Sequence, residues 1–182
     1  MRLFAALLPP PEVLDELEAF LAPHRDALPG LRWIGRDLLH VTLAFYGEVD
    51  DTRLERLLPR RERAAARHDP LGLSFAGAGA FPSGGAYARV LWTGLYGDRR
   101  RLAALAATMS AAGRRAGTPM GEHKAFRPHL TLARCRTPMD VRPLIESLSV
   151  FAGSTWRAGA IHLVRSHLRP AVHYETLKTW AL

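Results

Sequence analysis

Cysteine is almost absent from the sequence: Cys135 is the single one. A lone cysteine excludes an internal disulfide framework and a cysteine-rich zinc site. Long hydrophobic runs are absent as well. The apolar run after Arg2 is too short for a signal-peptide core and ends at Pro9–Pro11, so we expect neither a leader peptide nor a membrane span. The sequence therefore predicts a cytoplasmic protein that has no membrane partner.

Lysine is also rare. Of the 25 basic residues only Lys124 and Lys178 are lysines, and all the others are arginines. Because 17 residues are acidic, the formal net charge is +8 at pH 7. A basic, arginine-rich surface favours phosphate-rich partners such as nucleic acid, although a coding preference for arginine and alanine accounts for most of these positions.

The remaining composition is that of a globular chain. Hydrophobic residues make up 48% of the 182 residues and charged residues 23%, and neither a low-complexity tail nor a linker divides the chain. We therefore expect a single domain over residues 1–182 and a monomer. Segments that fit strands alternate with amphipathic helical segments, which predicts an α+β fold. The predicted strands cover residues 2–8, 31–34, 38–46, 70–76, 86–93, 129–134, 155–165 and 173–180. The predicted helices begin at Pro10 or Pro11, at Asp50 or Asp51, after Asp98, and at Pro138 within a capping box formed by Thr137–Asp140.

One tetrapeptide occurs twice. His40-Val41-Thr42-Leu43 recurs as His129-Leu130-Thr131-Leu132, almost half a chain later. Side chains alternate between the two faces of a strand. Each copy therefore presents an imidazole and a hydroxyl on one face and two apolar side chains on the other. Pseudo-twofold symmetry between the halves would place both polar faces around one small ligand.

Two imidazoles and two hydroxyls form a set that suits phosphodiester chemistry. Imidazole titrates near neutral pH, so one ring can act as a base while the other acts as an acid. Hydroxyl and guanidinium groups can stabilise the charge that develops on phosphate oxygens. No HExxH motif and no cluster of carboxylates with histidines is present, so we expect no metal and no cofactor.

These motifs and their flanks resemble the two-histidine (2H) phosphoesterase superfamily. Within it the chain is similar to the RNA 2′,3′-cyclic phosphodiesterases, also called 2′-5′ RNA ligases. The likeness rests on His40–Gly47, Phe126–Arg134, Leu163–Leu168 and Tyr174. Tyr46 is a departure, because the family usually has leucine there. The resemblance implies two pseudo-symmetric lobes, each an antiparallel sheet backed by helices, with a cleft between them.

The resemblance also implies an activity and its residues. The activity is metal-independent hydrolysis of an RNA 2′,3′-cyclic phosphate end, such as that of a tRNA half, to a 2′-phosphate; the reverse reaction would make a 2′-5′ linkage. His40 would donate the proton and His129 would accept it, an orientation that the sequence itself leaves open. Thr42, Thr131 and Arg134 would bind the phosphate.

Four further residues are candidates for binding RNA. Phe45 and Tyr46 follow the first motif, and either ring could stack on a base. Strict alternation places Tyr46 on the face of His40, so geometry favours Tyr46 and leaves Phe45 equally suited to the core. Lys124 and Arg127 precede the second motif, where they either guide the RNA backbone or are solvated charges.

Two other functions remain open at this point. One is a phosphodiesterase for a small cyclic nucleotide such as ADP-ribose cyclic phosphate. The other is a noncatalytic RNA-binding module that has kept the cleft. An assay on RNA ending in a 2′,3′-cyclic phosphate, with EDTA present, separates them.

Overall fold

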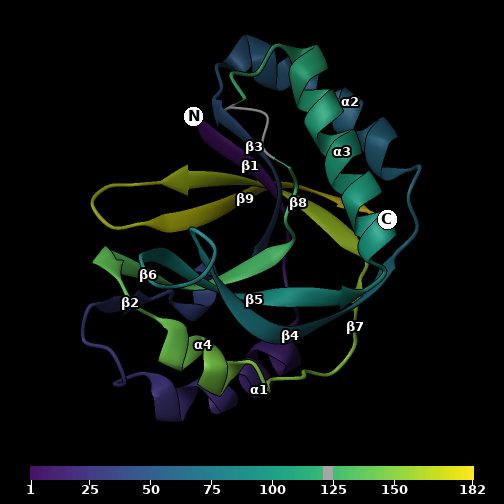
Figure 1. Cartoon of the computed structure of the whole chain (residues 1–182). Coiled ribbons are helices and arrows are strands. Elements are labelled where there is room, and N and C mark those ends of the chain that lie inside the picture. Colours follow the sequence, from purple (N-terminus) through teal and green to yellow (C-terminus); the bar gives the residue numbers. More distant parts are fainter. Residues whose placement is uncertain (121–124) are drawn as a thin grey trace.

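The computed structural model describes residues 1–120 and 125–182 of the chain. Within these residues, strands and helices follow one another in the order expected of an α+β fold (Figure 1). The strands are β1 (Arg2–Leu7), β2 (Leu31–Trp33), β3 (Val41–Glu48), β4 (Leu71–Phe81), β5 (Ala88–Gly97), β6 (His129–Met139), β7 (Trp156–Ala158), β8 (Ala160–His167) and β9 (His173–Ala181). The α-helices are α1 (Pro11–Leu21), α2 (Asp51–Ala65), α3 (Arg99–Ala116) and α4 (Arg142–Leu148), and the 3₁₀ helices are η1 (Ala22–His24) and η2 (Arg36–Leu38).

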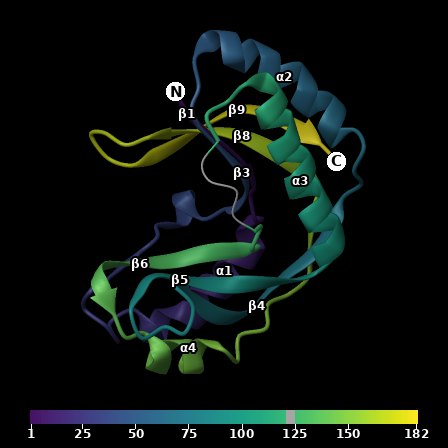
Figure 2. The same cartoon turned by 45° about the horizontal axis from the view of Figure 1, so that its top comes forward.

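All the described strands belong to one antiparallel sheet, in the order β7-β4-β5-β6-β3-β1-β8-β9, with β2 beside β6. The expectation of two separate sheets facing each other is therefore wrong, although the α+β class is confirmed. A single residue pair, Val41 with Leu130, joins β3 to β6. On each side of this junction three more strands follow the strand that carries a His-x-Thr motif: β5, β4 and β7 beyond β6, and β1, β8 and β9 beyond β3. The sheet curls strongly, so its two halves enclose a concave face (Figure 2).

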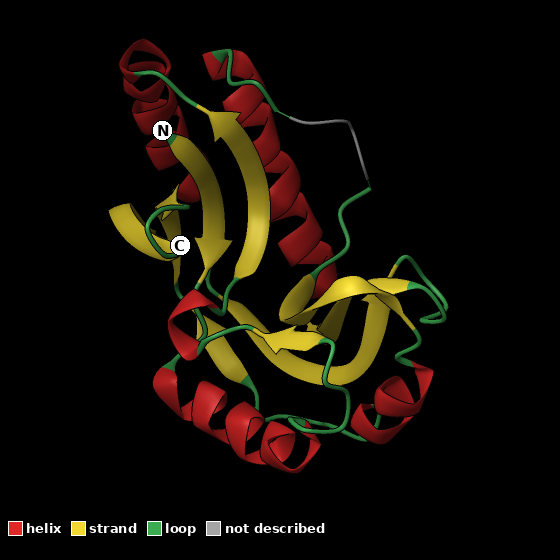
Figure 3. Ribbon diagram, turned by 90° about the vertical axis from the view of Figure 1, so that its left-hand side faces the viewer, coloured by secondary structure: helices red, strands yellow, loops and turns green. Residues whose placement is uncertain are grey.

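Two helices cover each half of the sheet. Helices α2 and α3 pack against one another and against β3 and β9, whereas α1 and α4 lie at the other end of the molecule beneath β4 and β5 (Figure 1; Figure 3 shows the same two groups of helices from the side). The inner side of these helices is apolar, as Val13, Leu17 and Leu105 illustrate, and it packs into one continuous core. The helices therefore leave the concave face of the sheet open.

Local sequence signals explain where most helices begin and end. Pro11 lies in the first turn of α1, where proline costs no hydrogen bond. The Asp50 side chain accepts a hydrogen bond from the Arg53 amide, which caps α2. Gly117 ends α3 in the left-handed conformation (φ 76°) that glycine adopts without strain.

The predicted capping box is an exception. Thr137 and Pro138 lie inside β6, which continues to Met139, and the helix begins only at Arg142, with Pro143 in its first turn. The expected start at Pro138 is therefore wrong. The pairing of Ala88 with Met139 extends the strand, because a tertiary contact outweighs a local capping signal.

No helix among residues 1–120 and 125–182 is both long enough and apolar enough to cross a membrane.

Candidate active site

The two His-x-Thr motifs lie on adjacent strands at the junction of the sheet halves. Because β3 and β6 are antiparallel and Val41 pairs with Leu130, the same register sets His40 opposite Thr131 and Thr42 opposite His129. Val41 and Leu130 are fully buried, so the four polar side chains share the other face. His40 and His129 are thus diagonal neighbours, which lie about 7–8 Å apart in a regular antiparallel pair.

Each motif strand contains a β-bulge at the leucine that follows the threonine. In β3, Ala6 pairs with Thr42 but Ala5 pairs with Ala44, so Leu43 is the extra residue. In β6, Trp92 pairs with Thr131 but Leu91 pairs with Ala133, so Leu132 is the extra residue. A bulge resets the alternation of side chains. The fifth residue after each histidine, Phe45 or Arg134, is therefore exposed on the histidine side, whereas strict alternation would bury it.

These bulges overturn one expectation about RNA binding. Tyr46 is fully buried, where its hydroxyl donates to the Met109 carbonyl at 3.2 Å and accepts from Arg61. The prediction that Tyr46 stacks on a base is therefore wrong. Phe45 is the exposed ring of the pair, at 38%, and the Arg2 guanidinium lies 4.7 Å from its centre.

The two imidazoles are held in the same way. Nδ1 of His40 lies 2.7 Å from the Leu38 carbonyl oxygen, and Nδ1 of His129 lies 2.7 Å from the Arg127 carbonyl oxygen. A carbonyl oxygen can only accept, so each Nδ1 carries the proton and donates it. Each neutral ring therefore has its lone pair on Nε2, the atom that is left to exchange protons with a ligand.

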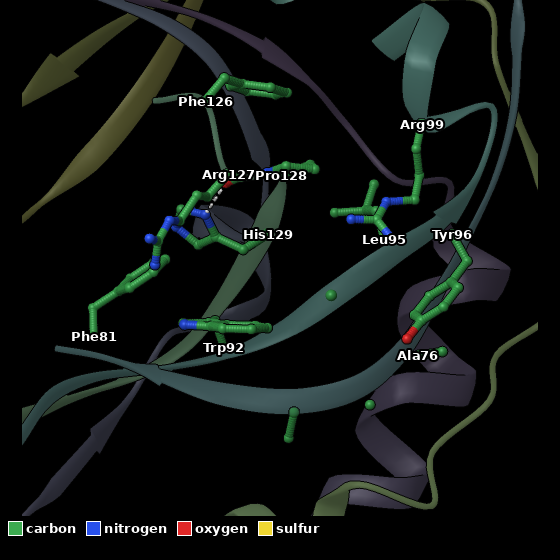
Figure 4. A pocket seen from close by; sticks show the side chains of 13 residues that line it. Ala76, Phe81, Trp92, Leu95, Tyr96, Arg99, Phe126, Arg127, Pro128 and His129 are labelled. Carbon is green, nitrogen blue, oxygen red and sulfur yellow. Dashed lines mark hydrogen bonds between the residues drawn. The ribbon is translucent and has the colours of Figure 1, made fainter. Parts of the chain in front are cut away.

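Aromatic rings fix the orientation of both histidines. The His40 ring lies 4.7 Å from Phe4 and 5.2 Å from Tyr174, measured between ring centres. The His129 ring lies 4.9 Å from Phe81, edge to face, and 6.3 Å from Trp92 (Figure 4). Gly79 permits this arrangement, because any Cβ at that position would collide with the Trp92 indole. Each imidazole is thus fixed by a carbonyl and by rings from neighbouring strands or their ends.

The surroundings lower the pKa of both histidines. Burial is the main cause at His40, and the charges of His129 and Arg134 act in the same direction. Burial is also the main cause at His129, with a further contribution from Arg134. In both cases the hydrogen bond to the carbonyl opposes the shift. Arg134 and the two rings therefore share one electrostatic environment, in which a bound anion would favour protonated imidazole.

Two cavities meet at His129. One, of about 910 Å³, extends over Thr42, Phe45, Arg89 and Ser110. The other, of about 370 Å³, extends over Trp92, Tyr96 and Arg99. Phe81, Phe126, Arg127 and His129 line both, and Figure 4 shows the smaller cavity between His129 and Tyr96. Both volumes lie in the range of small-molecule sites.

The threonine hydroxyls and Arg134 lie beside the histidines. Thr42 and Thr131 are half-buried, and no hydrogen bond to another described residue engages their hydroxyls. The Arg134 charge acts on His40, His129 and Tyr174 alike. The structure thus brings together five of the predicted residues, namely His40, Thr42, His129, Thr131 and Arg134.

Of the two predicted cations before the second motif, Arg127 is exposed, lines both cavities and supplies the carbonyl that holds His129. Lys124 lies outside the described residues. Sequence patterns missed Phe4, Phe81, Trp92 and Tyr174, because their positions beside the histidines depend on pairing between distant strands. Only Tyr174 gave a signal, as part of the family resemblance.

Within the part of the chain that the structure describes, no three His, Cys, Asp or Glu side chains gather as a metal site.

A concave α+β sheet that carries a His-x-Thr motif on each of two adjacent strands defines a two-histidine class of protein. The chain belongs to the 2′-5′ RNA ligase superfamily, whose family model matches residues 9–170. A Thermus thermophilus protein named RNA 2′,3′-cyclic phosphodiesterase is 32% identical over 177 residues, which are 93% of this chain and 84% of that protein.

Solved structures agree with this assignment. A crystal structure of a Thermus thermophilus protein matches with a TM-score of 0.80 at 30% identity, covering 100% of this chain and 98% of that chain. The Escherichia coli protein LigT in complex with 3′-AMP matches with a TM-score of 0.81 at 26% identity, covering 100% of this chain and 97% of that one.

Proposed function

We propose that this chain hydrolyses the 2′,3′-cyclic phosphate end of an RNA to a 2′-phosphate, by acid–base catalysis from His40 and His129 and without a metal. The observation that carries this proposal is the matched pair of imidazoles, each with Nδ1 bonded to a carbonyl and Nε2 left available. Relatives named RNA 2′,3′-cyclic phosphodiesterase support the substrate class. The residues proposed for catalysis and phosphate binding all come from one chain, so we expect a monomer to act.

The reaction needs one proton acceptor and one proton donor on opposite sides of the phosphorus atom. Nε2 of neutral His129 takes a proton from water as its oxygen forms a bond to phosphorus. The bond from phosphorus to the 3′ oxygen breaks, and protonated His40 gives its Nε2 proton to that oxygen. This assignment of acid and base follows the family. The products are a 2′-phosphate and a 3′-hydroxyl.

The negative charge on the phosphate oxygens requires donors in the same site. Thr42 and Thr131 point to the histidine face, and Arg134 carries a permanent positive charge there. Phe45 offers a ring for the terminal base at the wall of the larger cavity. If the 5′-hydroxyl of a second RNA took the place of water, the same proton transfers would form a 2′-5′ linkage.

A single assay tests the proposal. RNA oligonucleotides ending in a 2′,3′-cyclic phosphate are incubated with the protein in EDTA, and the product is examined for a 2′-phosphate. We expect turnover that EDTA does not reduce. A 3′-phosphate product, or loss of turnover in EDTA, would refute the mechanism. Binding without turnover would indicate a noncatalytic RNA-binding protein, and turnover restricted to small cyclic nucleotides would indicate that narrower substrate class.

Substitution of Arg134 tests its role and the acidity of the histidines together. Because both histidine pKa values are lowered from 6.5, the bell-shaped profile of kcat/KM for the wild-type protein should have its maximum below pH 6.5. In Arg134→Gln we expect kcat to fall on the order of tenfold, less than for an enclosed oxyanion donor, because Arg134 is exposed. Losing the positive charge should also move the maximum to higher pH. If the pH of maximal kcat/KM is the same in Arg134→Gln as in the wild-type protein, Arg134 does not act on the two histidines.

Phe45→Ala should weaken substrate binding. Base–aromatic stacking contributes about 1–3 kcal/mol, so KM for a dinucleotide cyclic phosphate should rise between about fivefold and a hundredfold while kcat changes little. The matched control is Phe45→Trp, which retains a stacking ring and should retain a low KM. Equal KM values for the alanine and tryptophan variants would show that no base stacks on residue 45.

A further inference from the structure

Apart from the buried Arg61, helix α2 carries its arginines on one flank. Arg53, Arg56, Arg60, Arg63 and Arg67, the last just beyond the helix end, are separated by three, four, three and four residues, which is the spacing of one helix face. The acidic residues of α2, Asp51, Glu55 and Glu62, are separated by four and seven residues and occupy a different flank. The charges of this helix are therefore segregated by sign.

Such a stripe is unfavourable for the helix itself. Like charges three or four residues apart repel each other, and opposite charges at those spacings would have stabilised the helix. Arg53 pairs with Asp50 at 2.5 Å, but Arg60 and Arg63 donate to backbone carbonyls one turn earlier. A general preference for arginine codons would scatter these residues around the helix. Here the arginines are separated from the acidic residues although their mutual repulsion destabilises the helix, and this arrangement favours an anionic ligand.

The stripe forms one wall of a groove with α3. Figures 1 and 3 show α2 and α3 side by side, and the two helices pack against each other. The groove has a volume of about 620 Å³, and small side chains such as Ala64 and Ala111 line it between the two walls. Among the residues that the structure describes, no acidic side chain lines it and five arginines do: Arg60, Arg63, Arg67, Arg114 and Arg115.

The dimensions of the groove suit a chain of phosphates better than one anion. From Ala107 to Arg115 the axis of α3 rises about 12 Å, and arginines lie along both walls. Helix α3 itself contains no Asp or Glu, so the positive potential is not offset from that side. Among the described residues, none of the five groove arginines forms an ion pair with a carboxylate. Arg60 and Arg63 each donate one hydrogen bond to a helix carbonyl, and the remaining N–H groups of these guanidinium forks suit phosphate oxygens.

Only one helix separates the groove from the catalytic cavity. Ser110 of α3 lines the larger cavity together with Thr42, whereas the next residue, Ala111, lines the groove. A helix with its side chains is about 10–12 Å across. An RNA strand whose end lies beside His129 can therefore cross α3 within a few nucleotides.

We propose that the α2–α3 arginine groove binds the phosphodiester backbone of the RNA strand behind its cyclic phosphate end. This proposal rests on the proposed function and extends it to substrate length: the cleft binds the terminal nucleotide, and the groove binds the body of the RNA. Binding in the groove is electrostatic and independent of sequence. Long RNAs should therefore have a lower KM than mono- or dinucleotides, with an advantage that salt reduces.

The test compares two substrates that share the same terminal dinucleotide cyclic phosphate, one a dinucleotide and the other a long oligonucleotide. In Arg60→Gln/Arg63→Gln, KM for the long RNA should rise on the order of tenfold, and its dependence on salt should become weaker. The kcat/KM for the dinucleotide should stay unchanged, which also shows that the variant is folded. Arg114→Gln/Arg115→Gln removes the opposite wall and should have the same effect.

The matched control removes two exposed arginines that lie outside the groove, in Arg100→Gln/Arg157→Gln, and should leave both substrates unaffected. An unchanged KM for long RNA in the groove variants, or an equal rise in the control, would overturn the proposal. If the wild-type protein turns over neither substrate, the proposed function fails by itself. Fluorescence anisotropy with the same long RNA then tests binding in the groove without turnover. Weaker binding by the groove variants than by the wild-type protein would support the groove proposal, and equal binding would overturn it.

Discussion

Replacing either His129 or His40 by alanine should reduce kcat for a dinucleotide cyclic phosphate on the order of 10²–10⁴-fold. Each ring commits Nδ1 to a backbone carbonyl at 2.7 Å, so in the proposed mechanism Nε2 exchanges the proton, and alanine offers no replacement. The rate is measured under single-turnover conditions, which separate chemistry from product release. His24→Ala, at a half-buried position of the 3₁₀ helix η1 away from both motifs, is the control and should retain full activity.

A change of leaving group distinguishes the acid from the base. A general acid matters most when the departing oxygen is strongly basic, and it matters little for an aryl oxide that leaves without a proton. On a nucleoside aryl phosphodiester, His40→Ala should therefore recover much of its lost rate, whereas His129→Ala should stay slow. The opposite pattern would exchange the two roles. Full activity of either variant on the cyclic phosphate would refute the paired mechanism.

The repeated tetrapeptide predicted the centre of the site because the direction of each side chain depends only on its position along its own strand. A strand places His40 and Thr42 on one face whatever surrounds it, and the same holds for His129 and Thr131. Val41 and Leu130 are buried as that alternation requires. The α+β class followed from equally local patterns of apolar residues.

The contacts around that centre depend on information that no local pattern contains. The bulges at Leu43 and Leu132 exist because distant strands pair in a particular register, and each moves the following side chains to the other face. Strict alternation therefore chose Tyr46 over Phe45. The single sheet was missed for a related reason: one residue pair, Val41 with Leu130, joins its halves, whereas the resemblance implied two lobes with a sheet in each.

The departure from the usual leucine at Tyr46 has a structural explanation. The Tyr46 ring packs so closely on α3 that a Cβ at Gly113 would lie 2.5 Å from it. Its hydroxyl accepts a hydrogen bond from Arg61, a fully buried arginine whose guanidinium lies between the Tyr46 and Trp180 rings, 4.9 and 5.0 Å from their centres. Burial raises the pKa of Tyr46 to about 12, so the hydroxyl stays neutral. Tyr46 thus stabilises a buried cation.

Tyr46→Phe should destabilise the fold without affecting the active site. The substitution keeps the ring but removes the hydrogen-bond acceptor of a buried guanidinium whose Nε and Nη2 already have no described partner. Leaving a buried charged donor unpaired costs about 2–3 kcal/mol. The free energy of unfolding, measured in urea, should fall by that amount with an unchanged m-value, while KM for the dinucleotide stays at the wild-type value.

A second substitution shows whether the buried charge is the cause. In Tyr46→Phe/Arg61→Met the charge is gone and an apolar chain fills its place, so most of the lost stability should return, because apolar replacements of buried polar pairs are often neutral. Phe45→Leu, on the exposed neighbour, should change the free energy of unfolding by less than about 0.5 kcal/mol. If Tyr46→Phe and Tyr46→Phe/Arg61→Met lose the same free energy of unfolding, the cause is altered packing and not the unpaired charge. A raised KM in Tyr46→Phe would restore residue 46 as a candidate for RNA binding, although its burial favours Phe45 for the proposed role.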